Sequence, residues 1–423
     1  MRIPLPMAIL LIIGSVLIDL YIYFDIRRNE NASRRRWSLV YAVASLLCWA
    51  FLGVCLLIPR RDASTDISFI MWGLYSYLSV YIPKFLFVVC SLLGGLPRLW
   101  RHKPLRTGLW AGLPLGIICF VMLWWGVGVT RHEIEVVDID IYSPRLPAGF
   151  DGYRIAQISD LHTGTWGNDT RFIARLCDSV NACHPDVIFF TGDIVNRETR
   201  ELQPFLKTLS TLHAPDGVYS ILGNHDYGDY MEWNSQSEKN DNLQLLKDWQ
   251  RQIGWKMLNN SHTELIAGGD TIQLIGVENW GEPPFHQYGN LIDAYPINPD
   301  SIHNLNDSRF KILLTHNPEH WVREVTKISN IDLSLSGHTH SMQSEFRLGK
   351  WRWSPAVFRY STWGGLYERE NPKGELMRIY VNIGAGEVGM PSRIGGAYPE
   401  ITVITLHRGE PAQGSPAKSS PAK

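Results

Sequence analysis

The apolar residues of this chain gather in its first third, and four runs there are long enough to cross a bilayer. A helix needs about 20 apolar residues to span the hydrocarbon core. The runs that meet this length cover residues 5–24, 37–58, 69–95 and 109–129. Tyrosine and tryptophan cluster near several of their ends, as interfacial anchors do. We therefore predict that residues 1–130 form a transmembrane region of about four helices.

Two charged residues lie inside these apolar runs. Asp19 falls in the first run, and Lys84 follows Pro83 in the third, which is the least regular of the four. A buried Asp–Lys pair would hold the helices together or mark a proton path. Alternatively, both side chains lie near an interface and reach the water along their apolar stems. We favour this second interpretation.

Basic residues in the short loops predict the orientation of the spans. The first and third loops hold nine, namely Arg27, Arg28, Arg34, Arg35, Arg36, Arg98, Arg101, Lys103 and Arg106. The opposite side holds four, namely Arg2, Arg60, Arg61 and Arg131. This places the two richer loops in the cytoplasm and the C-terminal domain on the outer side. The side would reverse if the third run were not a span.

From about residue 134 the pattern changes to short β-rich runs separated by polar segments. Residues 153–159, 186–191 and 217–222 read as buried strands, and 169–182 have helical spacing. This alternation favours a layered α/β fold. The later strand candidates have fewer helices between them and favour a sandwich of two sheets flanked by helices; they cover residues 271–277, 310–315, 331–336, 377–383 and 401–406.

The same pattern divides the chain. We expect a linker and lead-in strand over residues 131–152, one domain over 153–407, and a disordered tail over 408–423, where Pro, Ser, Ala and Lys dominate. Residues 227–262 and 279–308 are polar or proline-rich, and we interpret both as insertions that shape a substrate site.

Composition excludes some classes of function. With 40 basic and 41 acidic residues, the chain has no basic excess that would indicate nucleic-acid binding. Its six cysteines form no CxxC motif, so we expect neither a zinc knuckle nor a disulfide framework.

Residues that can bind metal follow five of the predicted strands. The sequence at these strand ends reads Asp160-Leu161-His162, Gly192-Asp193, Gly223-Asn224-His225-Asp226, His316-Asn317 and Gly337-His338-Thr339-His340. Ligands of layered α/β folds bind at the carboxyl ends of the strands. The sequence therefore predicts one metal site built from all five segments.

The spacing and charge of these residues suit a phosphate ester. An extended backbone would point Asp160 and His162, two residues apart, to the same side. Asp193 has two oxygens and suits a bridge between two ions. Two divalent ions bring four positive charges against two carboxylates, which leaves a net positive pocket that can clamp a phosphate. Mixed nitrogen and oxygen ligands favour Mn, Fe or Zn.

These motifs resemble those of the calcineurin-like metallophosphoesterases, over residues 153–406. The segment 395–401 is similar to the membrane-associated bacterial branch that acts on lipid-linked phosphoesters. The resemblance implies a four-layer αββα fold and two divalent metal ions. Carried over by motif, one ion takes Asp160, His162, Asp193 and His340. The other takes Asp193, Asn224, His316 and His338.

The resemblance also implies roles beyond metal binding. His225 would not bind metal but would protonate the leaving oxygen or stabilise the transition state, with Asp226 orienting its ring; a structural hydrogen bond is the alternative for His225. We interpret His320 as an ordinary helix residue. Arg393 either contacts phosphate or is a solvated surface residue.

One segment departs from the family pattern. The bacterial branch commonly has two glycines after the GHTH motif, whereas Ser341, Met342 and Gln343 follow here. We expect metal binding to survive this change and the substrate-facing loop to differ in shape.

Together these features predict a membrane-anchored phosphodiesterase or pyrophosphatase that hydrolyses an envelope or lipid-linked phosphoester. One alternative is a UDP-2,3-diacylglucosamine pyrophosphatase-like hydrolase of lipid A synthesis, although that pathway is cytoplasmic and conflicts with the outward orientation. Others are a non-catalytic receptor or scaffold, and a transporter formed by the four spans. None of the seven metal-binding residues that the family pattern requires is missing from the sequence, which disfavours a non-catalytic scaffold.

Overall fold

A computed structural model describes residues 5–27, 32–59, 67–100, 102–103, 105–283, 286–295, 305–349 and 351–411. The chain forms two compact units, one of residues 1–128 with 389–392 and one of residues 129–388 with 393–423. Most of the tail that we expect to be disordered lies outside the described residues. The finer division that we propose, with a linker over 131–152, stays a prediction.

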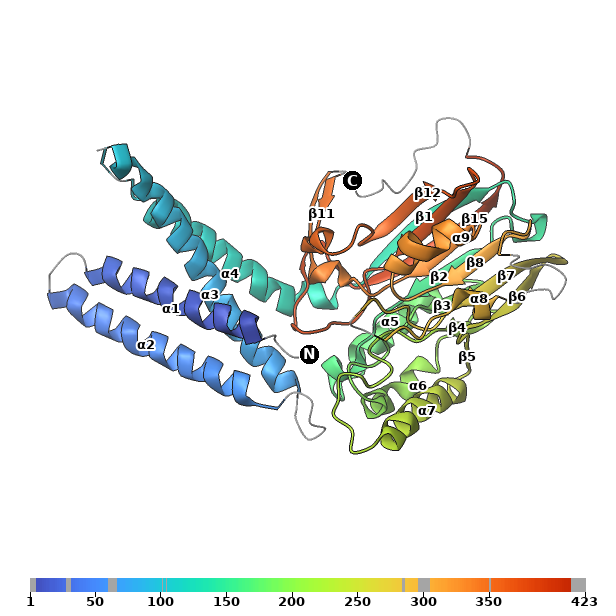
Figure 1. Cartoon of the computed structure of the whole chain (residues 1–423), viewed down its shortest axis with the longest axis horizontal. Helices are drawn as coiled ribbons and strands as arrows, with labels where there is room; N and C mark the ends of the chain where they lie inside the picture. Colours follow the sequence, from blue (N-terminus) through green and yellow to red (C-terminus); the bar gives the residue numbers. More distant parts are fainter. Residues whose placement is uncertain are drawn as a thin grey trace. The chain divides into compact units, whose positions relative to one another are not determined.

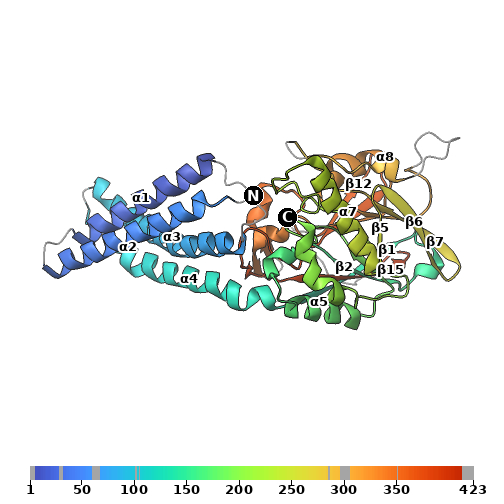
Figure 2. The ribbon, with the colours of Figure 1, turned by 90° about the horizontal axis from the view of Figure 1, so that it is seen from below.

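The first unit is helical. Its four long helices are apolar enough to cross a membrane, and both views show them side by side (Figures 1 and 2). They are α1 (Leu5–Arg27), α2 (Ala32–Leu57), α3 (Ile67–Gly95) and α4 (Leu113–Gly128), and a π-helical turn over Gly108–Gly112 precedes α4. The third helix runs through Pro83 without a break, so the weakest of the four predicted spans is a continuous helix.

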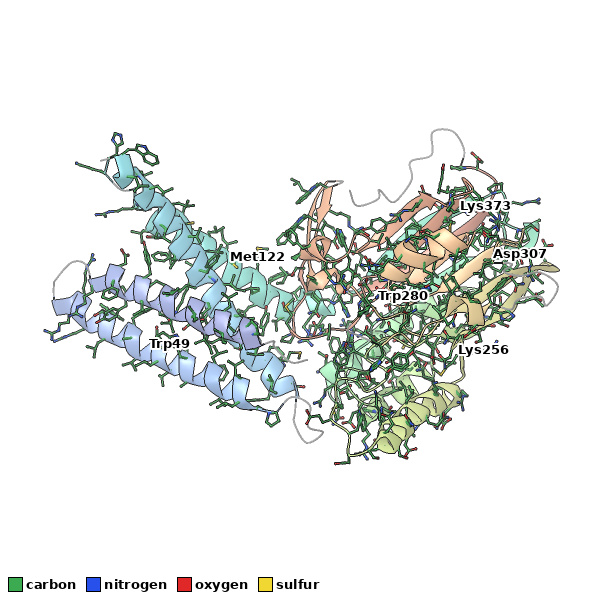
Figure 3. All side chains as sticks on the ribbon, viewed as in Figure 1. Trp49, Met122, Lys256, Trp280, Asp307 and Lys373 are labelled. Atoms are coloured by element: carbon green, nitrogen blue, oxygen red, sulfur yellow. The ribbon has the colours of Figure 1, made fainter. Side chains whose placement is uncertain are left out.

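Asp19 on α1 and Lys84 on α3 form an ion pair of 2.9 Å, and the Asp19 side chain is 3% exposed. The hydroxyl of Tyr41 on α2 donates to the same carboxylate at 2.5 Å, and that of Tyr81 on α3 does so at 2.6 Å. The indole of Trp49, which Figure 3 labels on α2, donates at 2.9 Å. Our interpretation that Asp19 and Lys84 separately reach the interface is therefore wrong, because the carboxylate is buried among donors from two neighbouring helices.

Three glycines spaced four apart bring α4 and the turn before it close to α3. A Cβ at Gly108 would lie 2.6 Å from the Cβ of Ser91. A Cβ at Gly112 would lie 2.9 Å from that of Cys90, and one at Gly116 would lie 3.1 Å from the Pro83 carbonyl. Small residues at this spacing allow membrane helices to pack backbone against backbone.

In the described residues, the second unit contains two six-stranded sheets and a small third sheet. The first sheet has the order β1 (Glu135–Ser143), β15 (Glu400–Arg408), β2 (Arg154–Ile158), β3 (Val187–Phe190), β4 (Val218–Ser220) and β5 (Trp255–Met257). The second has the order β12 (Gly365–Glu370), β13 (Leu376–Val381), β9 (Leu333–Ser336), β8 (Lys311–Leu314), β7 (Asp270–Gly276) and β6 (Ser261–Ala267). The third comprises β11 (Trp351–Trp353), β10 (Ser344–Leu348) and β14 (Ile394–Gly395).

Three apolar cores arrange these elements in four layers (Figure 1). Phe189, Leu274 and Leu335 belong to the core between the two large sheets. The outer face of the first sheet packs against α5 (Arg171–Ala182), α6 (Leu206–Leu209) and α7 (Gln236–Gln252). The outer face of the second packs against α8 (Leu291–Ala294) and a π-helical turn over Trp321–Val325, which leads into α9 (Thr326–Ile328). The predicted αββα fold is confirmed.

The segment 227–262, which we interpret as an insertion, is partly framework. It contains α7 and β5, and β5 pairs with β4 to extend the first sheet. The helix is hard to recognise in the sequence because few of its side chains are buried, Leu246 among them. The second expected insertion, 279–308, contains α8, and its residues 284–285 and 296–304 lie outside the described part of the chain.

Candidate metal centre

The seven residues that we predict to bind metal all follow strands of the two large sheets. Strands β2, β3 and β4 are parallel neighbours in the first sheet, and β8 and β9 are parallel neighbours in the second. Parallel strands end at the same edge, so their following loops meet there. The structure brings these loops together, with ligand atoms in overlapping groups that each lie within 4.8 Å.

The first cluster joins side chains that follow β2 and β9. The Nε2 atom of His340 lies 3.1 Å from Asp160 Oδ1 and 3.1 Å from His162 Nε2. Asp193 approaches the same cluster, with its Oδ2 3.6 Å from His162 Nε2. All four residues are buried.

The second cluster shares Asp193. The Nε2 atom of His316 lies 3.1 Å from Asp193 Oδ2 and 3.2 Å from Asn224 Oδ1. The Nδ1 atom of His338 lies 3.2 Å from the same His316 nitrogen. The seven side chains thus lie in two adjoining clusters that meet at Asp193, and His162, Asp193 and His225 form a further group of potential ligand atoms between them. Which residues bind which ion stays a prediction.

The ring nitrogens in these clusters suit metal ions. The Nδ1 atom of His316 lies 2.7 Å from the Thr191 carbonyl, so it carries the proton of the neutral ring, and the lone pair of Nε2 faces Asp193 and Asn224. When two neutral imidazoles face each other through ring nitrogens, one nitrogen must carry a proton that it donates to the other. A metal ion between them instead accepts the lone pairs of both nitrogens. The convergence of buried imidazoles on carboxylates therefore fits divalent metal.

Electrostatics point the same way. Burial disfavours the charged forms of Asp160 and Asp193, but the imidazoles of His340 and His316 hold the pKa of each carboxyl below its usual value. Burial also disfavours a charged His316, but the Asp193 carboxylate outweighs it and raises the pKa of His316 to about 9. Burial and the neighbouring His316 lower the pKa of His338 to about 3. The two carboxylates thus stabilise positive charge at these rings, and either bound protons or bound metal ions can supply that charge.

The backbone at the site differs from our expectation. Asp160 and His162 do not lie on an extended strand, because β2 ends at Ile158 and both residues are left-handed, with φ of 54° and 43°. Asp193, His338 and His340 also have positive φ. Left-handed backbone costs non-glycine residues of the order of 1 kcal/mol each, so packing around the site holds these side chains in place against a local preference.

Two of the motif glycines are required by close approach. A Cβ at Gly223 would lie 2.2 Å from Asp193 Oδ1, and one at Gly337 would lie 2.2 Å from Asp160 Oδ2. Any side chain at these positions would displace a carboxylate of the site. The glycines therefore allow neighbouring loops to meet over the two aspartates.

His225 lies against the first cluster, but its contacts correct one expectation. Its ring meets that of His162 edge to face, and its Nδ1 lies 2.6 Å from the carbonyl oxygen of Asn196. Asp226 instead accepts hydrogen bonds from the backbone N–H groups of Asp193, Ile194 and Gly223, at 2.8–2.9 Å. The group that orients the His225 ring is thus the Asn196 carbonyl, and Asp226 fixes the loops that carry Asp193 and Asn224.

Two tyrosines join the site that motif reasoning did not include. Tyr230 stacks on the His225 ring at 4.2 Å between centroids, and its hydroxyl accepts a hydrogen bond from Asn224 Nδ2 at 2.9 Å. The hydroxyl of Tyr360 lies 3.1 Å from His338 Nε2. Neither tyrosine belongs to a spaced motif; the only signal for Tyr230 is its place six residues after Asn224.

His320 lies in a helical segment, as we interpret it from the sequence, whereas Arg393 differs from both of its sequence interpretations. His320 is fully buried, and its ring stacks on that of Trp280, which Figure 3 labels. Arg393 is also fully buried and donates to backbone carbonyls, among them those of Gly384 and Gly386. It is therefore neither a solvated surface residue nor a phosphate contact, because its guanidinium is used to hold the loop between β13 and β15.

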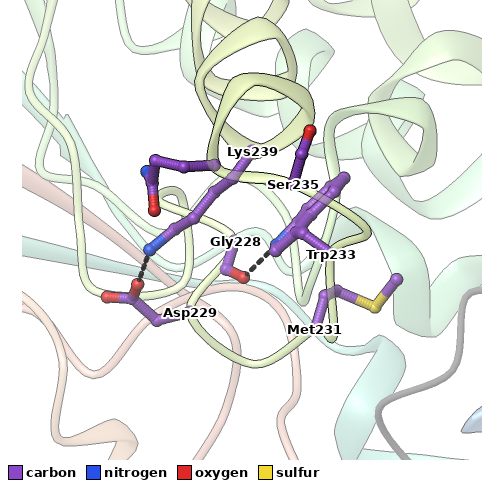
Figure 4. Close-up of a pocket in the computed structure, with 7 residues that line it drawn as sticks. Gly228, Asp229, Met231, Trp233, Ser235 and Lys239 are labelled. Carbon is purple, nitrogen blue, oxygen red and sulfur yellow. Dashed lines mark hydrogen bonds and ion pairs between the residues drawn. The ribbon is translucent and has the colours of Figure 1, made fainter.

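An open pocket of about 290 Å³ lies in the loop that follows His225 (Figure 4). In the close-up, Lys239 reaches across to the Asp229 carboxylate, and the Trp233 indole donates to the Gly228 carbonyl. Tyr230 lies in the same loop, between the lining residues Asp229 and Met231, but does not itself line the pocket. Its lining comprises Gly228, Asp229, Met231, Trp233, Ser235, Gln236 and Lys239.

Comparison with known proteins agrees with this geometry. Residues 153–342 match the family model of the calcineurin-like phosphoesterases, and residues 1–130 match that of a probable calcineurin-like phosphoesterase transmembrane domain. A metallophosphoesterase of Bacillus subtilis, YkuE, is 30% identical over 288 residues, which cover 66% of this chain and 90% of that protein. The chain belongs to the calcineurin-like phosphoesterases.

Two further relatives are similar to this chain, one named as a transmembrane protein and one named as a pyrophosphatase. A transmembrane protein with metallophosphoesterase domain from Danio rerio is 26% identical over 390 residues, which cover 90% of this chain and 82% of that protein. The UDP-2,3-diacylglucosamine pyrophosphatase LpxG of Chlamydia trachomatis is 27% identical over 326 residues, which cover 66% and 92%. The chain is thus a membrane protein of a family that uses divalent metal ions.

Proposed function

We propose that this protein is a membrane-anchored phosphoesterase that uses two divalent metal ions to hydrolyse a phosphodiester or pyrophosphate of a lipid-linked envelope substrate. The observation that carries the proposal is the convergence of seven ligand-type side chains from five strand ends, with Asp193 common to both clusters. A site that retains the complete set favours hydrolysis over a non-catalytic scaffold.

In this proposal the first ion is held by Asp160, His162, Asp193 and His340, and the second by Asp193, Asn224, His316 and His338. Two such ions, when bound, polarise the phosphoryl group and supply hydroxide at neutral pH. Mn, Fe and Zn all suit the mixed nitrogen and oxygen donors.

His225 is the proposed proton donor to the leaving oxygen. The Asn196 carbonyl 2.6 Å from its Nδ1 holds the proton on that nitrogen in the neutral ring. The second proton of the imidazolium is then on Nε2, from which it can pass to the leaving group. Stacking on Tyr230 fixes the plane of the ring.

The pocket between Gly228 and Lys239 is a candidate for the organic part of the substrate. It combines the apolar surfaces of Met231 and Trp233 with polar groups, as ligand pockets do. Trp233→Ala should raise KM for the natural substrate and leave kcat unchanged, because the residue lies outside the metal centre. An equal KM would remove the pocket from the proposal.

A second candidate follows from the likeness to LpxG, namely cleavage of the pyrophosphate of a UDP-linked acylated sugar. The basic loops favour a catalytic domain on the outer side, away from a cytoplasmic pathway. Protease accessibility in spheroplasts distinguishes the two, because only an outward domain is cut without lysis.

The decisive experiment uses the full chain in nanodiscs with Mn²⁺ and bis(p-nitrophenyl) phosphate. Asp193→Asn should lower the rate at least 100-fold, on the order expected for disturbing a metal site. Asp178→Asn, the same substitution on the exposed face of α5, should leave the rate unchanged. Mn²⁺ should also raise the melting temperature of the wild type and not of Asp193→Asn. A half-active Asp193→Asn would contradict the proposal.

A further inference from the structure

The hairpin of β10 and β11 and the turn after it expose a cluster of large apolar side chains. Phe358 is 83% exposed, Leu348 is 78% exposed and Trp351 is 55% exposed. Leu348 is the cross-strand partner of Trp351, and Phe346 that of Trp353, so these four side chains lie on one face of the hairpin. The ring of Trp353 lies 5.8 Å from that of Phe346 and 6.2 Å from that of Phe358, which joins Phe358 to the same patch. We call residues 344–358 the apolar hairpin. Contiguous exposed surface of this kind marks an interaction site.

An ion pair ties the apolar hairpin to the chain that leaves the membrane. Arg347 on β10 forms a bidentate pair with Glu135, with nitrogen–oxygen distances of 2.6 and 2.9 Å. Glu135 is the first residue of β1, and α4 ends at Gly128. Seven residues of extended chain span at most about 25 Å. The ion pair therefore joins the hairpin to a residue only seven positions along the chain from the end of the last membrane span.

The apolar hairpin is also joined at both ends to the candidate metal centre. It begins directly after the turn His340–Gln343, whose first residue is in the first cluster. It ends two residues before Tyr360, whose hydroxyl lies 3.1 Å from His338 Nε2. The hairpin thus connects His340 of the first cluster to Tyr360, which contacts the second cluster.

We propose that the apolar hairpin inserts into the interfacial layer of the bilayer and presents a membrane-borne phosphoester to the metal centre. Trp, Phe and Leu are the side chains that enter this layer most readily. Both arginines of the hairpin are already paired, Arg352 with the buried Glu345 and Arg347 with Glu345 and Glu135; its third basic residue, Lys350, lies outside the described residues. The described side chains therefore favour insertion through apolar burial rather than through attraction to anionic lipid.

The first test measures insertion without reference to activity. An environment-sensitive fluorescent amino acid is placed at position 358 of the full chain, in nanodiscs that contain doxyl-labelled lipid. The control position is Ile266, which is 64% exposed on β6, the edge strand of the second sheet. We expect strong quenching at 358 and none at 266, in phosphatidylcholine alone as well as in phosphatidylglycerol. No quenching at 358, or quenching equal to that at 266, overturns the proposal.

A second copy of the chain is the competing occupant of the patch. Reconstitution at a low ratio of protein to nanodisc leaves one copy per disc. Quenching at 358 that is retained under this dilution supports insertion. Quenching or a spectral shift that disappears on dilution shows a contact between copies and overturns it.

The second test concerns presentation and rests on the proposed function. The double variant Leu348→Ser/Phe358→Ser should hydrolyse a membrane-embedded phosphodiester on the order of tenfold more slowly, since two apolar side chains no longer favour the interface. Its rate on soluble bis(p-nitrophenyl) phosphate, and both rates of Ile266→Ser, should stay within about twofold of wild type. An equal loss of rate on the embedded and the soluble substrate would contradict the proposal that the hairpin presents the substrate. If the wild type hydrolyses neither substrate, the proposed function is contradicted, and the quenching result still tests insertion.

Discussion

Asp19 and Lys84 form a buried ion pair between α1 and α3, with 2.9 Å between Oδ1 and Nζ. Three further donors fill the remaining lone pairs of the carboxylate, and the Lys84 ammonium lies 4.4 Å from the centre of the Tyr81 ring. Satisfied networks of this kind specify one arrangement of helices. The membrane region is therefore a defined bundle rather than a set of independent anchors.

Removing the Asp19 carboxylate should unfold this bundle more easily. Asp19→Ala leaves Lys84 without its partner in an apolar setting, and a broken buried pair costs about 3–5 kcal/mol. Thermal unfolding in detergent measures the loss. Asp25→Ala, at an exposed position of the same helix, is the control and should change little. The double variant Asp19→Leu/Lys84→Leu should recover much of the loss; if it does not, the pair is not what links the two helices.

The glycine contacts between α3 and α4 give a second prediction. Gly112→Ala places a methyl group 2.9 Å from the Cβ of Cys90 and should destabilise the bundle by about 1–3 kcal/mol. Gly128→Ala in α4 itself has nothing within 4 Å of the new Cβ and should be neutral or slightly stabilising. Unfolding by SDS titration compares them. Equal midpoints would show that the helices do not meet at Gly112.

His225 should matter most for poor leaving groups. If its imidazole protonates the leaving oxygen, His225→Ala should slow hydrolysis of an alkyl ester by about 10²–10⁴-fold. A p-nitrophenyl ester, which leaves as a stable anion, should be slowed much less. The measurement is kcat for a series of esters with increasing leaving-group pKa. A loss that is the same for every ester would exclude a proton-donor role.

Asp226 should act through stability rather than proton transfer. Its carboxylate accepts three short hydrogen bonds from backbone N–H groups, and Asp226→Ala leaves these buried donors unpaired. Each unpaired donor costs about 1–3 kcal/mol. We expect a lower melting temperature and weaker Mn²⁺ binding by calorimetry. The dependence of kcat on the leaving group should remain that of the wild type, in contrast to His225→Ala.

Met342 should be replaceable by glycine with a gain in stability. Four consecutive residues, His340–Gln343, have positive φ, and Met342 has φ of 46°. The bacterial branch commonly has glycine at two of these positions, where only glycine is free of strain. Met342→Gly should gain about 1 kcal/mol, which is about 2–4 °C in melting temperature. Met231→Gly, which removes the same side chain elsewhere, should lower it.

The sequence alone locates the residues of the candidate site because they follow strands directly. A buried strand and the two or three residues after it are local features, so Asp160 or His316 can be located without knowledge of the fold. The contacts of Asp226 and Arg393 cannot, because their acceptors and donors belong to loops that meet only in the folded chain. Helix α7 is missed for a different reason, since its exposed polar surface hides the periodicity on which recognition depends.

The pairing of β1 with β15 has a consequence for biosynthesis. β1 lies at the edge of the first sheet, and its register with β15 runs from Glu135 opposite Glu400 to Ser143 opposite Arg408. At roughly 5–20 residues per second, the ribosome needs roughly 13–53 s to add the 265 residues between Glu135 and Glu400. During that time the first strand beyond the membrane waits without its partner, with Ile139 and Ile141 uncovered. Completion of the catalytic domain thus depends on the last strand made, and a chain shortened before β15 would leave an aggregation-prone strand beside the bilayer.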